Sequence, residues 1–278
     1  MKNLKKLTIL HSNDMHGDFL AEQIDERLVG GVSLLSGYVN KVRREEKNVI
    51  YAVAGDMFRG SVIDSEYKGT STIGIMNLVG PDVATIGNHE FDHKGTGFAE
   101  MLNAAKAAQT AAMGLLTDSQ YPPRNLEAYQ AQYGPVTLVL PALLEANYAP
   151  AEENPDRDFI QSAMDDYGVT DCMTLERGGV TYGLFGLMGV DSDDCAPTSG
   201  FTLTDAAEAA KRCVEKLKGE GAEIILCLSH SGTAEAPAVS EDEELAKAVD
   251  GIDVIISGHT HTTLAEPLVV NDTYIVSC

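Results

Sequence analysis

The sequence predicts an α/β fold, and two observations lead to this prediction. Short runs rich in β-branched and aliphatic residues alternate along the chain with segments whose apolar residues recur at helical spacing. Five of these runs are each followed directly by a short polar motif that carries histidine, aspartate or asparagine. In open α/β sheets, ligands bind beyond the carboxyl ends of the strands. The five motifs are therefore expected to meet at one edge of the molecule.

Five buried strands are expected, because each run is short, apolar and rich in β-branched residues. In chain order they are Leu7–Leu10, Val49–Val53, Val83–Ile86, Glu223–Leu228 and Ile252–Ser257. A further strand is expected over Thr181–Val190, broken by Gly183, Gly186 and Gly189.

Helices are expected between the strands. One contains the apolar residues Leu34, Leu35, Tyr38, Val39 and Val42, and a second contains Ala209, Ala210, Cys213, Val214 and Leu217. Gly219 closes the second helix, and Ser240 with Glu243 forms a capping box for a helix that runs to about Val249. An alanine-rich helix is expected to end near Gly114, and the acidic residues 145–176 are interpreted as a solvated surface excursion.

Composition limits the classes of function. The 278 residues are 44% hydrophobic and 22% charged, as in an ordinary globular domain, so collagen-like and low-complexity chains are excluded. The 42 acidic residues outnumber the 20 basic ones and leave a net charge of −22. Such a chain repels the phosphate backbone, so no nucleic-acid partner is expected. A small anionic substrate is still compatible, because a bound metal ion can dominate the local charge.

Cysteine usage and the N-terminus point to a reducing compartment. The five cysteines are an odd number without a Cys-x-x-Cys pair, which fits neither a disulfide framework nor a zinc ribbon. Residues 1–6 resemble the start of a signal peptide, but the apolar run Leu7–Leu10 is too short for its hydrophobic region. A cytoplasmic location without membrane association is therefore expected.

The motifs after the strands contain five of the chain's seven histidines. Taken singly each motif is weak, since an aspartate after a strand is most often a helix N-cap and a Gly-Asn pair is most often a turn. Their joint occurrence at equivalent strand ends favours a single site. The residues concerned are Asp14, His16, Asp56, Asn88, His89, His230, His259 and His261.

The residue types restrict the metal. Imidazole together with carboxylate and amide oxygen suits manganese, iron, cobalt, nickel or zinc, whereas calcium and magnesium prefer oxygen ligands alone. The absence of cysteine from the set excludes a structural thiolate zinc site. Six or seven ligands exceed the needs of one tetrahedral ion, which indicates two ions that share a carboxylate.

The order of these motifs resembles the calcineurin-like metallophosphoesterases. The strings Leu10–Gly17, Gly55–Ser61, Gly87–Asp92 and Ala146-Asn147 are similar to the bacterial 5′-nucleotidase branch of that family. The resemblance implies a four-layer α-β-β-α sandwich of the metallo-dependent phosphatase type. It also implies that residues 1–278 form one catalytic domain, without the C-terminal nucleotide-binding domain of that branch.

The resemblance implies a role for each motif residue. One metal ion is expected on Asp14, His16, Asp56 and His261, and a second on Asp56, Asn88, His230 and His259. Asp56 would thus bridge the two ions. His89 and Asp92 are expected to form a catalytic dyad, with His89 assisting the leaving group. The ions (manganese, zinc, iron or cobalt) would deliver a metal hydroxide to the phosphate.

The implied activity is hydrolysis of nucleoside 5′-monophosphates or related phosphate esters, in nucleotide catabolism. A 2′,3′-cyclic-nucleotide phosphodiesterase, a nucleotide-sugar hydrolase and a thiosulfate-ester hydrolase are alternatives within the same fold. A metal-binding recognition module is the alternative from another class, although no motif ligand is missing. Residues 114–140 are extra relative to the compact family pattern, and His93 is expected to be a surface histidine. The sequence leaves the oligomeric state open.

Overall fold

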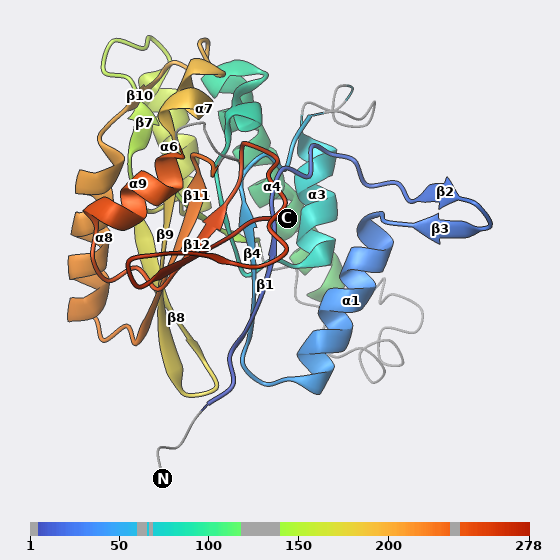
Figure 1. The fold of residues 1–278 in the computed structure, drawn as a ribbon. Helices are drawn as coiled ribbons and strands as arrows, with labels where there is room; N and C mark the ends of the chain where they lie inside the picture. The colour runs from blue at the N-terminus through green and yellow to red at the C-terminus, as the bar shows by residue number, and fades with distance from the viewer. Residues whose placement is uncertain (1–4, 60–65, 67–68, 118–139, 234–239) are drawn as a thin grey trace.

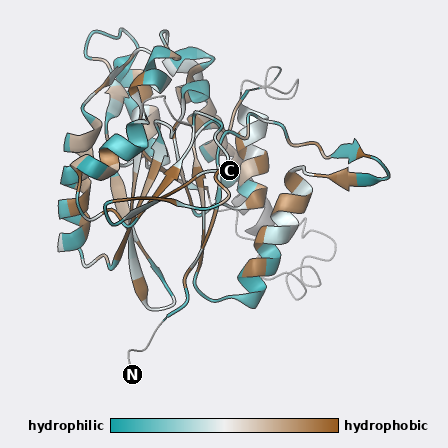
Figure 2. Cartoon of the chain, in the orientation of Figure 1, coloured by the Kyte–Doolittle hydropathy of each residue, from teal (hydrophilic) through white to brown (hydrophobic). Residues whose placement is uncertain are grey.

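The computed structural model describes residues 5–59, 66, 69–117, 140–233 and 240–278. Two β-sheets pack face to face at the centre, and helices cover their outer faces (Figure 1). The predicted four-layer sandwich is confirmed. Figure 2 shows hydrophobic residues concentrated on the central strands and hydrophilic residues on the outer helices.

The first sheet consists of four parallel strands in the order β1-β4-β5-β6. They are β1 (Thr8–Ser12), β4 (Val49–Ala54), β5 (Val83–Thr85) and β6 (Ala142–Leu144). The helices on its outer side are α1 (Val32–Glu45), α3 (Thr70–Val79), α4 (Lys94–Thr117) and α6 (Arg157–Tyr167). Helix α4 therefore ends three residues beyond the predicted Gly114. A short 3₁₀ helix, η1 (Asn88–Phe91), follows β5.

The second sheet has six strands in the order β13-β14-β12-β11-β9-β8. They are β8 (Cys172–Arg177), β9 (Val180–Met188), β11 (Ile224–His230), β12 (Val254–Ser257), β13 (Leu268–Val270) and β14 (Thr273–Val276). The four inner strands are parallel, and β8 and β13 run antiparallel at the edges. Helices α8 (Ala206–Gly219) and α9 (Glu241–Ala248) cover its outer face.

The apolar core has three layers, one between the two sheets and one between each sheet and its covering helices. Successive residues of a strand point alternately into the two layers on either side of its sheet. In β4, Tyr51 and Val53 face the helices, whereas Ile50, Ala52 and Ala54 face the second sheet. Strand β11 has the same alternation, since its odd-numbered Ile225 and Cys227 contact the cluster under α8 while Leu226 and Leu228 lie between the sheets. Because successive side chains of a strand point to opposite faces of the sheet, each of these fully buried strands packs against two apolar layers.

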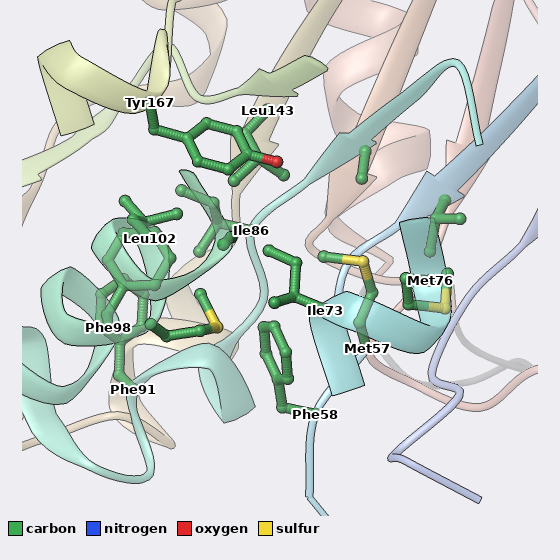
Figure 3. Close-up of a cluster of buried hydrophobic side chains, with 14 of the residues drawn as sticks. Met57, Phe58, Ile73, Met76, Ile86, Phe91, Phe98, Leu102, Leu143 and Tyr167 are labelled. Atoms are coloured by element: carbon green, nitrogen blue, oxygen red, sulfur yellow. The ribbon is translucent and has the colours of Figure 1, made fainter. Parts of the chain in front are cut away.

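The interpretation of residues 145–176 as a solvated excursion is wrong. The stretch contains β7 (Tyr148–Pro150), which pairs with β10 (Phe201–Leu203), as well as α6 and β8. Helix α6 buries one face, and its last residue Tyr167 lies with Leu143 and Leu102 in the apolar cluster under the first sheet (Figure 3). The acidic side chains occupy only the opposite face of this amphipathic helix.

The glycines of β9 do not break the strand, which runs unbroken from Val180 to Met188. A side chain at Gly186 would collide with the backbone carbonyl of Leu144, because the two sheets approach each other closely there. Ala146 N–H donates to the Gly186 carbonyl at 2.9 Å, so the segment that follows β6 is hydrogen-bonded to β9 of the second sheet at this point. Glycine in a strand marks such close backbone approaches.

Asp82 connects three elements on the side of the sheets where β4 and β5 begin. Its carboxylate accepts from Arg43 of α1 at 2.8 Å, from Arg177 of β8 at 2.9 Å and from the Tyr51 N–H at 2.9 Å.

A short hairpin of β2 (Glu22–Ile24) and β3 (Arg27–Val29) projects from the body of the molecule (Figure 1). The remaining short helix is α7 (Val190–Asp194). None of the described helices is long and apolar enough to cross a membrane. Of residues 114–140, all but the ends lie outside the described residues.

Candidate metal centre

The structure brings the seven predicted ligands together at one edge of the sandwich. Asp14 and His16 follow β1, Asp56 follows β4 and Asn88 begins η1 after β5. His230 is the last residue of β11, and His259 with His261 follows β12. The two sheets thus contribute from both sides, at the carboxyl ends of their parallel strands.

One half of the cluster consists of Asp14, His16 and His261. The Nε2 atoms of His16 and His261 lie 2.9 Å apart, and Nε2 of His261 lies 3.7 Å from the Asp14 carboxylate. One ligand atom from each of the three residues falls within 4.8 Å of the others. Burial lowers the pKa of His16, so its ring is neutral and able to coordinate.

The other half consists of Asp56, Asn88, His230 and His259. Nε2 of His230 lies 3.2 Å from Asp56 Oδ2 and 3.2 Å from Asn88 Oδ1. Nδ1 of His259 lies 3.1 Å from the same Asn88 oxygen. Asp56 belongs to this group and also to a group with His16 and His89, so it stands between the two halves.

The surroundings of His230 test whether the residues fit a cation. Its Nδ1 lies 2.8 Å from the Ala54 carbonyl, which can only accept, so Nδ1 carries a proton and Nε2 faces the oxygens of Asp56 and Asn88. Burial acts to lower the pKa of His230, but Asp56 and Asp14 outweigh it and raise the pKa to about 9. These oxygens thus favour positive charge at Nε2, which a metal ion supplies in place of a proton.

The backbone of the cluster is strained. Five of the seven ligand residues have a positive φ, a region that residues with side chains rarely adopt: Asp14 (49°), His16 (49°), Asp56 (50°), His259 (75°) and His261 (52°). Each such residue costs on the order of 1–3 kcal/mol, and such outliers concentrate at functional sites. Hydrogen bonds between neighbouring strand ends hold two of them, from Asp14 N–H to the Gly55 carbonyl and from His16 N–H to the Asp56 carbonyl. The strain supports a role for these loops beyond packing.

His89 and Asp92 form the predicted pair. His89 Nδ1 lies 3.0 Å from Asp92 Oδ1, and His89 Nε2 lies 4.0 Å from Asp56 Oδ2. Burial acts to lower the pKa of His89, but the hydrogen bond that its ring donates to Asp92 and the charge of Asp56 outweigh it, so the pKa is raised. His93 is exposed, as predicted.

Comparisons with known proteins agree with this geometry. The family model described as calcineurin-like phosphoesterase matches residues 7–140. The chain is similar to this family over these residues. The trifunctional nucleotide phosphoesterase protein YfkN of Bacillus subtilis is 28% identical over 277 residues, which are 96% of this chain and 16% of that protein. The 5′-nucleotidase of Rattus norvegicus is 28% identical over 267 residues, 93% of this chain and 38% of that protein.

A solved structure of the 5′-nucleotidase precursor from Thermus thermophilus matches the fold with a TM-score of 0.72 at 23% identity, over 98% of this chain and 48% of that chain. The chain therefore spans less than half of each of these proteins. The family that matches residues 7–140 implies divalent metal ions.

Three residues around the metal centre had no assigned role from sequence. Glu90 is buried and accepts the backbone N–H groups of Asp56, Met57 and Phe58 at 3.1, 2.8 and 3.3 Å, which fixes the loop that carries Asp56. Burial and the nearby Asp56 raise the pKa of Glu90 to about 7. Its position in the string Gly-Asn-His-Glu was visible, but nothing in the string reveals this capping role.

Arg59 and Asp191 are the other two. Arg59 reaches both members of the His89–Asp92 pair, with Nη1 3.2 Å from His89 Nδ1 and Nε 3.4 Å from Asp92 Oδ2. Asp191 Oδ2 lies 2.9 Å from His259 Nε2. A carboxylate accepts the Nε2 proton, which leaves the Nδ1 lone pair directed at Asn88 and the inner cluster. No sequence signal indicates this pair, because 68 positions separate its members.

Proposed function

We propose that the chain is a phosphoric-ester hydrolase with a dinuclear metal centre, acting on nucleoside 5′-monophosphates or related esters. The observation that carries the proposal is the position of Asp56 between the two halves of the cluster, grouped with His230 and His259 on one side and with His16 on the other. The donor set of imidazole, carboxylate and amide oxygen fits manganese, zinc, iron or cobalt. The names of the relatives, a nucleotide phosphoesterase and 5′-nucleotidases, support a nucleotide substrate.

The ligand assignment within this proposal follows the two halves of the cluster. Asp14, His16 and His261 would hold one ion, Asn88, His230 and His259 the other, and Asp56 both. When bound, two divalent ions supply an activated water nucleophile and neutralise charge on the phosphate oxygens. We further propose that residues 1–278 act as one catalytic domain.

His89 is proposed to hold the proton that the leaving alkoxide needs. Its ring lies next to Asp56 and so faces the cluster, and Asp92 fixes the ring through Nδ1. That hydrogen bond leaves Nε2 as the atom directed at the substrate. Assistance of this kind contributes about 10²–10⁴-fold to the rate. Arg59, beside both residues, adds positive charge where phosphate oxygens would lie.

The decisive experiment measures hydrolysis and metal content of the full chain after chelation and reloading with Mn²⁺ or Zn²⁺. The substrates are AMP, UMP, a 2′,3′-cyclic nucleotide, a nucleotide sugar, thiosulfate ester and a simple aryl phosphate. We expect chelation to abolish turnover and reloading to restore it, with monophosphates hydrolysed fastest. Bound metal without turnover of any substrate would instead indicate a recognition module.

Substitutions separate the bridging ligand from the others. Asp56→Asn should lose more metal and more turnover than His261→Ala, because Asp56 contributes to both ions. His93→Asn is the matched control, since this histidine is exposed and stands outside the cluster. Retention of two ions per chain in Asp56→Asn, measured by elemental analysis, would refute the dinuclear assignment.

A further inference from the structure

A second group of metal-capable side chains lies on the outer side of His259. Helix α7 carries Asp191, and Cys195 follows its last residue with helical backbone angles. The Cys195 N–H donates to the Asp191 carbonyl at 3.1 Å, so the helical turn continues through this residue. Residues four apart on a helix lie on the same face. Asp191 and Cys195 therefore form a chelating pair of the same i, i+4 spacing that metal-binding helices use.

His259 completes this group from the opposite side. A carboxylate oxygen of Asp191, the sulfur of Cys195 and a ring nitrogen of His259 all lie within 4.8 Å of one another. Asp191 and Cys195 are both exposed, so a cation can reach them from solvent. Thiolate, imidazole and carboxylate together are the donors of zinc sites, and the thiolate favours soft cations over manganese or magnesium.

The helix itself adds negative charge around these donors. Asp194 directly precedes Cys195, and its charge acts on the Cys195 thiol. Glu241 of α9 accepts the N–H groups of Val190 and Asp191 at 2.9 and 3.1 Å, which anchors the start of α7. The chelating pair is thus held in place from α9, and the negative charges of Asp191 and Asp194 attract a cation to it.

We propose that Asp191, Cys195 and His259 form an outer site for one thiophilic divalent cation of the zinc class, beside the inner cluster and sharing His259 with it. On binding, the Cys195 thiol releases its proton to solvent and becomes a thiolate ligand. The proton on Nε2 of His259 passes to Nδ1 through solvent, so that Nε2 can coordinate. No electron is transferred in either step.

Occupation of the outer site withdraws His259 from the inner one. A neutral imidazole has a single unprotonated nitrogen, and Nδ1 of His259, 3.1 Å from Asn88 Oδ1, is the nitrogen that faces the inner cluster. A cation on Nε2 moves the proton to Nδ1 and removes the lone pair that faces the inner cluster. Excess zinc-class cation should therefore inhibit the enzyme, a consequence that rests on the proposed function.

The outer site is tested directly with Cd²⁺ on the full chain preloaded with Mn²⁺. A cadmium–thiolate bond gives an ultraviolet charge-transfer band, and no inner ligand is a cysteine, so the band reports the outer site. We expect a saturable band in the wild type, its loss in Cys195→Ser, and its retention in Cys278→Ser, in which the other exposed cysteine is replaced. A band that persists in Cys195→Ser, or no band in the wild type, overturns the proposal.

Alkylation of the unmodified chain provides a second measurement that needs no variant. Peptide mass spectrometry should show Cys195 protected by Cd²⁺ and Cys278 alkylated at an unchanged rate. For inhibition, Cys195→Ser should require at least about tenfold more Zn²⁺ than the wild type or Cys278→Ser, since even loss of a residue that merely orients a ligand weakens metal binding about 10–100-fold. Equal inhibition of all three proteins refutes the competition. If no substrate is hydrolysed at all, the cadmium band still decides whether the outer site exists.

Discussion

Replacement of Glu145 by glutamine should change how the stability of the protein depends on pH. Glu145 follows β6 and is 5% exposed. Its Oε1 accepts the Asn147 N–H at 3.2 Å, while its Oε2 is buried without a hydrogen-bond partner among the described residues. Burial raises the pKa of Glu145 to about 8; His230 on β11 acts to lower this pKa and Asp171, just before β8, acts to raise it. The native state therefore keeps this carboxyl protonated at neutral pH.

The direction and size of this pH dependence follow from the difference between the pKa of Glu145 in the native state and its pKa in the unfolded chain. The unfolded chain loses this proton near pH 4.5, whereas the native state keeps it until about pH 8. Between these values the native state binds one more proton, so stability falls by about 1.4 kcal/mol per pH unit. The stabilisation that the protonated Glu145 contributes is fully present below pH 4.5 and is lost as the pH rises through 8. The free energy of unfolding falls over this range by at most about 4–5 kcal/mol. Glutamine stays neutral and lacks this dependence.

The assay is urea unfolding at pH 5, 6, 7 and 8 with a chelator present, so that metal binding does not contribute. Glu145→Gln should match the wild type near pH 5 and exceed it in free energy of unfolding by several kcal/mol at pH 8. Glu215→Gln, on the exposed face of α8, serves as the control and should follow the wild type throughout. Parallel curves for wild type and Glu145→Gln would refute the reasoning.

Three further outcomes are expected. His89→Asn should keep its metal content but lower kcat by about 10²–10⁴-fold for poor leaving groups; the loss should shrink for an aryl phosphate, and equal losses would contradict proton donation. Asp191→Asn should weaken metal binding at the inner site by about 10–100-fold in calorimetric titration with Mn²⁺, whereas the neighbouring Asp194→Asn should not. Asp82→Asn should lower the free energy of unfolding by about 2 kcal/mol, because two arginines lose a charged partner; an unchanged urea midpoint would show that solvent replaces the carboxylate.

The strands and the candidate ligands could be predicted because their signals are local. A short apolar run followed by Asp-x-His or Gly-His-x-His places the polar residue at the end of a strand, whatever the rest of the chain does. All five strands with such motifs are present, within a few residues of the expected bounds. The assignment of each ligand to an ion stays a prediction, since proximity alone does not distinguish one ion from two.

The prediction for residues 145–176 was wrong because their acidic charge was given more weight than their helical periodicity. Ile160, Ala163, Met164 and Tyr167 recur at helical spacing in the sequence, and all four are buried on α6. A helix tolerates many carboxylates on one face while its other face packs against a neighbour. The prediction that glycines break strand β9 was also wrong. From sequence alone a glycine indicates a break in a strand, and the close approach of a second backbone that explains it becomes visible only in the structure.

The residues that sequence reasoning missed are those whose role depends on contacts between distant segments. Asp191 orients a ring 68 positions away, and Asp82 meets Arg177 across 95 positions. Neither has a neighbouring motif that reveals it.

Contacts between distant segments also link the fold to the proposed chemistry. The first sheet supplies Asp14 and Asp56, and the second supplies His230 and His259. Since only the packed sandwich holds these four side chains together, an ion that binds them should stabilise the contact between the two sheets as well as the loops with positive φ.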